Sequence, residues 1–144
     1  MKITKTLLSF FMFASLVNAM EPIKSKYDFN TTYENAKNFL TQNNIPIFAE
    51  FDHSKNAKEV GLELNATKVI VFGNPKVGTF LMQENPQISM ELPLKISIYE
   101  DTKHNTYITY TNIKELAKKY NIKNKQVVTN IDKLLQEIVK ISTK

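Results

Sequence analysis

Apolar residues recur along the chain with two different periods, and these periods predict its secondary structure. Alternating or short continuous apolar runs predict strands at 23–29, 47–51, 69–72, 94–99 and 107–111. Apolar residues spaced three and four apart predict helices at 32–42, 55–64, 75–84, 113–120 and 127–140. The last helix has the clearest pattern, because a stripe of valine, isoleucine and leucine opposes a polar side along its whole length.

Polar residues mark where the predicted helices begin. Thr31 precedes a glutamate by three positions, which is the capping-box spacing, and Ser54 and Asn112 stand at comparable starts. Asn74 followed by Pro75 combines a preferred cap with the residue favoured at the first helical position. These five residues predict the N-terminal ends of four helices.

The order of the elements predicts the fold class. The strands at 94–99 and 107–111 are joined by a short polar loop and form a hairpin, while the earlier strands alternate with helices. We therefore expect an α+β fold with a single, mostly antiparallel sheet of about five strands and helices packed on one face. The chain shows no internal repeat, low-complexity stretch or linker, so residues 20–144 are expected to form one domain.

The first 19 residues have the pattern of a secretory signal peptide. Lys2 and Lys5 precede an apolar run over 7–17, and Ala19 stands where a signal peptidase cleaves. The run is shorter than the roughly 20 residues needed to span a bilayer, which favours cleavage near Ala19 over a retained membrane anchor. We expect a periplasmic or secreted product with no stable membrane insertion after cleavage.

Composition narrows the classes of function. The 144 residues include no cysteine, which excludes disulfides, thiol nucleophiles and thiolate metal sites. The formal net charge is +5, and all 19 basic residues are lysines. Arginine carries the planar fork that grips phosphate and guanine, so its absence, with the lysines scattered rather than clustered, argues against a nucleic-acid partner.

The densest group of unusual residues lies at 72–79, where a predicted strand meets a predicted helix. The N-terminus of a helix exposes N–H groups that bind anions; Lys76 would add charge, Thr79 a hydroxyl, and Gly78 room for a ligand near the backbone. The alternative is a well-capped helix whose glycines serve close packing. The segment lacks the phosphate-loop pattern, so no nucleotide is indicated.

His53 is the main candidate for a metal ligand. It continues the strand face that carries apolar residues 47, 49 and 51, so its side chain is expected to point inward. Together with Met82 and Met90 it would offer the imidazole and thioether groups that suit copper(I) or haem. The alternatives are a structural histidine and methionines that fill the core. No catalytic residues are identified, because the acidic pairs at 50/52 and 100/101 fit solvated strand ends.

Five segments of this chain resemble the bacterial domain of unknown function 302 family, at 51–57, 61–64, 69–79, 81–82 and 92–95. The string Phe-Gly-Asn-Pro-Lys followed by Gly-Thr, at 72–79, is the most specific part of the resemblance. The resemblance implies a β-α-β(4)-α-like sandwich and members that associate as oligomers. It implies no activity. The matching residues, whose roles it leaves unassigned, are His53, Asn56, Asn74, Pro75, Gly78, Thr79, Met82 and Lys95.

The leading hypothesis is a non-catalytic binding module for a small anionic or amphipathic ligand. The ligand would lie near the helix that begins at Asn74, with His53 and Lys95 nearby. One alternative is a periplasmic metal- or haem-binding protein that uses His53 with Met82 or Met90. The other is a structural or interaction protein that self-associates, for example as a homodimer.

Overall fold

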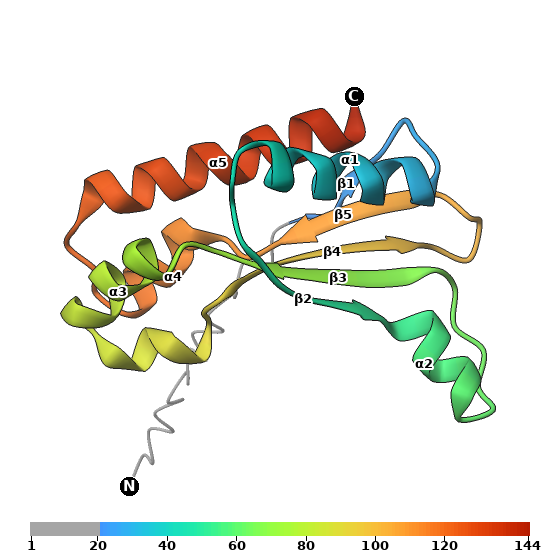
Figure 1. Ribbon diagram of the computed structural model, residues 1–144, viewed down its shortest axis with the longest axis horizontal. Coiled ribbons are helices and arrows are strands. Elements are labelled where there is room, and N and C mark those ends of the chain that lie inside the picture. The colour runs from blue at the N-terminus through green and yellow to red at the C-terminus, as the bar shows by residue number, and fades with distance from the viewer. Residues whose placement is uncertain (1–20) are drawn as a thin grey trace, which may run out of the picture.

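Five strands form a single antiparallel sheet in the order β1-β5-β4-β3-β2, as the computed structural model shows for residues 21–144 (Figure 1). The leader expected at 1–19 lies outside the described residues. The strands are β1 (Ile23–Lys24), β2 (Ile47–Asp52), β3 (Thr67–Phe72), β4 (Leu94–Glu100) and β5 (Thr106–Tyr110). Every neighbouring pair is antiparallel, which confirms the predicted α+β class.

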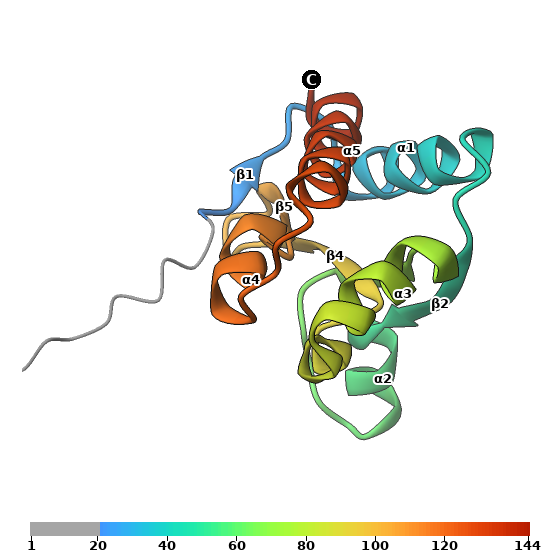
Figure 2. The ribbon, with the colours of Figure 1, turned by 90° about the vertical axis from the view of Figure 1, so that its left-hand side faces the viewer.

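Two long helices lie on the same face of this sheet, as Figures 1 and 2 show. They are α1 (Phe29–Gln42) and α5 (Lys125–Thr143), and they pack against each other. The shorter helices follow individual strands: α2 (His53–Glu59), α3 (Pro75–Glu84) and α4 (Ile113–Lys119). A 3-10 helix, η1 (Pro86–Met90), comes directly after α3. Within residues 21–144, no helix is long and apolar enough to cross a membrane.

The core lies between the sheet and the two long helices. Alternation along β4 places Leu94, Ile96 and Ile98 on the helix side, where each is buried. The stripe of α5 supplies the opposing layer, as its predicted pattern requires. Side chains that are 0% exposed come from both layers: Ala36, Leu40, Ile70, Phe72, Ile96, Ile98, Ile108, Leu135 and Ile138.

The first helix begins earlier than its sequence predicts. A strand was expected over 23–29 with Thr31 as the cap, but β1 ends at Lys24 and Asp28 caps α1. The Asp28 carboxylate accepts the backbone N–H and the hydroxyl of Thr31, each at 2.9 Å. The buried Ser25 hydroxyl accepts the N–H of Tyr27 at 3.0 Å, so this turn satisfies backbone groups that a longer strand would have paired.

The second strand and helix also differ from the prediction. A bulge in β2 between Ile47 and Ala49 pairs them with Phe72 and Val71, so they point to opposite faces rather than the same one. Asp52, not Ser54, caps α2: its carboxylate accepts the Ser54 hydroxyl at 2.6 Å. The helix ends at residue 59, before the positive φ at 61, and the apolar side chains at 60, 62 and 64 remain exposed.

Hydrogen bonds to the Asp101 carboxylate in the β4–β5 turn predict that the protein loses stability in acid. The Asp101 carboxylate accepts hydrogen bonds from the side chain and backbone of Asn105 and from the Lys103 N–H, and these lower its pKa below the ordinary 3.8. A lowered folded-state pKa means that this stability is present above pH 3.8 and is lost as pH falls through the folded value.

We expect Asp101→Asn to reduce the loss of unfolding free energy between pH 5 and about pH 2.5, measured by denaturant titration at each pH. Glu137→Gln, which changes an exposed carboxylate of α5, is the matched control and should follow the wild-type profile. An Asp101→Asn profile parallel to that of the wild type would contradict the role assigned to this carboxylate.

Candidate functional site

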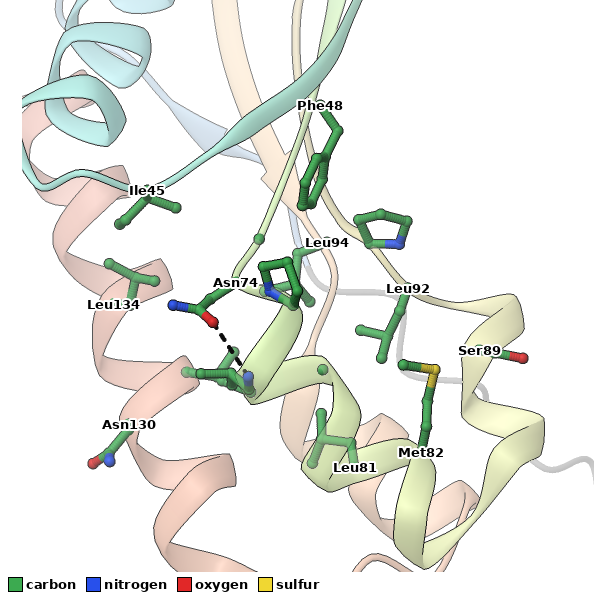
Figure 3. A pocket seen from close by; sticks show the side chains of 16 residues that line it. Ile45, Phe48, Asn74, Leu81, Met82, Ser89, Leu92, Leu94, Asn130 and Leu134 are labelled. Atoms are coloured by element: carbon green, nitrogen blue, oxygen red, sulfur yellow. Dashed lines mark hydrogen bonds between the residues drawn. The ribbon is translucent and has the colours of Figure 1, made fainter.

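A cavity of about 480 Å³ lies between α3, η1, the start of β4 and the middle of α5 (Figure 3). Its lining is almost entirely apolar, and the side chains of Asn74, Ser89 and Asn130 are the polar exceptions. No charged side chain of residues 21–144 lines it. The apolar and glycine lining consists of Ile45, Phe48, Gly73, Pro75, Val77, Gly78, Leu81, Met82, Leu92, Pro93, Leu94, Ile131 and Leu134.

The predicted start of α3 positions one wall of this cavity, and the prediction is confirmed. The Asn74 side-chain oxygen accepts the N–H groups of Lys76 (2.9 Å) and Val77 (3.4 Å), and Pro75 occupies the first turn. The helix therefore begins directly after the buried strand β3. Helical spacing then brings Val77, Leu81 and their neighbours at 78 and 82 to the side that faces the cavity.

The glycines of the motif leave space at the cavity wall. A Cβ added at Gly78 would stand 3.7 Å from Leu92 Cδ1 and 3.9 Å from Met82 Cε, which is ordinary contact distance. A Cβ at Gly73 would stand 3.5 Å from Phe48 Cε2. Both positions tolerate a methyl group, so close packing alone does not require glycine there.

Hydrogen bonds at the far end of α3 hold the two walls together. The Glu84 carboxylate accepts the backbone N–H groups of Lys123 and Asn124, just before α5 begins. Asn85 Nδ2 donates to the Tyr120 carbonyl at 2.9 Å. These contacts fix α3 against the α4–α5 connection, so the cavity has a defined shape.

The structure brings together only part of the predicted site. Asn74, Gly78 and Met82 line the cavity. Lys76 and Thr79 are exposed on α3 outside the lining, and the Thr79 hydroxyl donates to the Pro75 carbonyl at 2.7 Å. Lys95 also lies outside the cavity lining. It is exposed, and its ammonium donates to the Pro93 carbonyl at 3.1 Å.

His53 and Asn56 lie at the other end of the sheet, contrary to the prediction that His53 is near Asn74. Ile47, at the start of β2, pairs with Phe72 beside the cavity, whereas His53 follows the last residue of that strand. Six residues of strand separate the two ends by roughly 20 Å. Both side chains are exposed, and the His53 ring stacks on Phe51 with centroids 6.4 Å apart.

The predicted metal set is therefore not assembled. Met82 lines the cavity, His53 lies across the sheet, and Met90 on η1 is 83% exposed. Direct ligation requires bonds of about 2 Å, which these positions do not permit. Among residues 21–144, no group of three histidine, aspartate or glutamate side chains could hold a metal ion.

The acidic pair on β2 joins elements rather than forming a catalytic pair. Glu50 bridges to Lys37 of α1 at 2.7 Å, and Asp52 lies 3.6 Å from the Lys68 ammonium on β3. That ammonium also lies 4.7 Å from the centre of the Tyr33 ring. Burial of Tyr33, with the nearby Glu50 carboxylate, raises the pKa of its phenol. Each carboxylate therefore ties β2 to a neighbouring element.

Several residues that line the cavity come from elements far apart in the chain and were not predicted as site residues. Phe48 enters through the β2 bulge, Leu92 follows η1, and Asn130 and Leu134 come from α5. In the sequence, Leu134 reads as part of an ordinary core stripe, and Asn130 reads as polar surface. Phe48 on β2 is 49% exposed, and an exposed large apolar side chain of this kind marks a candidate binding surface once a structure is available.

Part of this chain is similar in sequence to known proteins. The 110 matched residues are 30% identical to the fluoride-specific ion channel FluC 1 of Brucella suis biovar 1 (strain 1330) and to FluC 1 of Brucella abortus biovar 1 (strain 9-941). The match covers 76% of this chain but 43% and 41% of those proteins, so the chain spans less than half their length.

A solved structure shares the fold. The crystal structure of an uncharacterized conserved DUF302 protein from Bacillus stearothermophilus superposes with a TM-score of 0.73 at 20% identity, covering 86% of this chain and 97% of that one. The family model described as Domain of unknown function DUF302 matches residues 22–138. The resemblance noted in the sequence is confirmed, and the chain belongs to the DUF302 family.

Proposed function

We propose that this domain is a non-catalytic binding module that holds a small apolar or amphipathic molecule in the cavity between α3 and α5. The observation that supports the proposal is the cavity itself, at about 480 Å³ and with an apolar lining. Small-molecule sites are typically concave spaces of about 300–1,000 Å³ with a few polar groups among apolar ones. Release of water from this lining would supply the driving force for binding.

The charge distribution favours this ligand class over a simple anion. In the part of the chain that the structure describes, no cationic side chain lines the cavity, and Lys76 lies on the exposed side of α3. The N–H groups of the first turn that an anion would need already donate to Asn74. An anion inside would lose hydration without compensation. Fluoride, which the name of the Brucella relatives mentions, is an anion and would lose its hydration in the same way, so we do not propose that this cavity binds it.

Titration of the purified protein with the neutral fluorescent probe N-phenyl-1-naphthylamine tests the proposal. We expect saturable binding of one probe per chain, displacement by uncharged single-chain amphiphiles, and a raised melting temperature. At a ligand concentration of 100 times Kd, the stabilisation would be about 2.7 kcal/mol. Fluorescence that rises linearly without saturation would count against a defined site. The blocking variant described in the Discussion locates the site.

We propose that this protein is exported, because its first 19 residues have the pattern of a signal peptide. The ligand would then be bound outside the cytoplasm. Mass spectrometry of the protein from a periplasmic extract would show whether the chain begins after Ala19. That proposal is independent of the binding site.

Self-association is a second candidate, favoured by the sheet face opposite α1 and α5. β2 is an edge strand, and this face carries the Phe51 side chain, 47% exposed, and the stacked rings of Tyr99 and Tyr107, 5.7 Å apart. A second copy of the chain would cover the aromatic groups and the open backbone edge together.

We expect light scattering to give the mass of a dimer for the wild type and of a monomer for Phe51→Glu. Phe80→Glu, which changes a similarly exposed phenylalanine on α3, should leave the dimer intact. A wild-type monomer at high concentration would rule out this candidate.

A further inference from the structure

We infer that the ligand of the cavity carries an uncharged hydrogen-bond acceptor, such as an ester or carbonyl oxygen, at the head of an apolar chain, and that Asn74 donates to it. This inference rests on the proposed function and names its ligand class. It follows from the way the Asn74 amide at the rim is already used by the protein.

The orientation of Asn74 is set by its role as a helix cap. Its side-chain oxygen accepts from two backbone N–H groups, so the amide nitrogen must point the other way. Figure 3 shows that nitrogen directed from α3 toward α5 at the edge of the cavity. Asn74 is exposed, and within residues 21–144 its nitrogen donates to no protein acceptor, so a ligand acceptor can replace water at its N–H groups.

Asn130 also lines the cavity, but its amide does not supply a second donor there. Its side-chain oxygen accepts from Gln126 Nε2 at 2.8 Å, one helical turn earlier on α5. Figure 3 shows the Asn130 amide on the side of α5 away from α3. The donor is therefore assigned to Asn74 alone.

The remaining lining indicates where the chain of the ligand lies. Among residues 21–144 no carboxylate side chain lines the cavity, so an ammonium head would find no anionic partner there. Leu81, Met82 and Leu92 form an apolar surface beyond the Asn74 amide (Figure 3). An acceptor head at this amide with a flexible apolar chain over these side chains satisfies both regions.

Four compounds with the same ten-carbon chain test the inference: methyl decanoate, decanoate, decylamine as its ammonium ion, and decane. We expect methyl decanoate to bind at least about tenfold more tightly than decylammonium, measured by probe displacement, because only the ester accepts a hydrogen bond from Asn74. Decanoate should bind more weakly than the ester, because no cationic side chain of residues 21–144 lines the cavity. The ester and the carboxylate then show whether the head group is neutral or charged.

The sharpest variant is Asn74→Asp, which keeps the capping oxygen but replaces the donor nitrogen by a second oxygen. We expect methyl decanoate affinity to fall about tenfold and decylammonium affinity to stay equal or rise. Asn112→Asp makes the same change at the cap of α4, where the side-chain oxygen accepts from Lys114 and Glu115, and should leave both affinities unchanged. Unaltered melting temperatures would show that both caps persist.

The outcomes separate this inference from the proposed function. Equal affinities for all head groups, unaffected by Asn74→Asp, would overturn the inference while saturable binding upheld the module. Preference for decylammonium would also overturn it. If no compound saturates, both the proposed function and the inference fail.

Discussion

Phe72→Ala is expected to lower the free energy of unfolding by about 3–5 kcal/mol, the range for large core aromatics. Phe72 is fully buried at the end of β3, where it pairs with Leu94 on one side and Ile47 on the other. Removal of the ring leaves a void that these strands cannot close. Because small domains are stable by only about 5–15 kcal/mol, much of the protein should unfold at moderate denaturant concentrations.

Guanidinium titration followed by circular dichroism measures this loss. Phe80→Ala is the matched control, because Phe80 on α3 is 41% exposed and its removal creates no enclosed void. We expect the control to lose less than about 1 kcal/mol. A Phe72→Ala variant as stable as the control would mean that the end of β3 is not part of the core, and the cavity wall beside it would be misplaced.

Gly78→Leu is expected to reduce ligand affinity by about 100-fold or more while the protein stays folded. A Cβ at this position already touches Leu92 and Met82 at contact distance, so the rest of a leucine side chain must occupy the cavity. Leucine is also a better helix former than glycine by roughly 0.5–1 kcal/mol, which helps to maintain α3. Loss of binding would therefore report a filled site rather than unfolding.

Gly78→Ala provides the matched control for this prediction. Its single methyl group fits at 3.7–3.9 Å from the neighbouring side chains and leaves most of the cavity open. We expect affinity to change only a few-fold and the melting temperature to rise slightly, since alanine is favoured over glycine by up to about 1 kcal/mol in a helix. If Gly78→Leu binds the probe as the wild type does, the ligand lies elsewhere and the proposed site is wrong.

The glycine at position 78 is itself informative. A helix interior normally disfavours glycine, and residue 78 has neither a positive φ nor a contact closer than ordinary packing that would require it. The sequence motif therefore contains a residue that costs stability without local benefit. Under the proposed function, glycine at 78 preserves cavity volume for a ligand.

Several elements could be predicted because their signals are local. The start of α3 depends on Asn74 and Pro75, and the β4–β5 hairpin depends on alternation and on the acidic turn at Asp101. Where two local signals competed, the prediction failed: Asp28 displaced Thr31 as the cap, and Asp52 displaced Ser54. Aspartate caps both helices because its carboxylate accepts a backbone N–H and a hydroxyl together. The single hydroxyl oxygen of serine or threonine is a weaker acceptor for both.

The candidate site was predictable only in part for the same reason. Asn74, Gly78 and Met82 share one helix, and their common place in the cavity follows from helical spacing. The prediction that His53 lies beside them failed because β2 runs antiparallel to β3: Ile47 pairs with Phe72, so His53 lies at the far end of the strand. The predicted inward direction of His53 failed separately, because a bulge between Ile47 and Ala49 breaks the alternation and α2 begins at His53. Periodicity gives the direction of a side chain only while the strand remains regular.

Taken by itself, the sequence determined the α+β class, the order of strands and helices, the amphipathic stripe of α5 and the cap of α3. Each depends on residues within about four positions of one another, where propensity, capping and period act. The tertiary structure alone decided the cavity, because its walls come from Phe48, Leu92 and Leu134, which are far apart in the chain. Its volume is the space left when whole elements pack together, and no local pattern encodes that remainder.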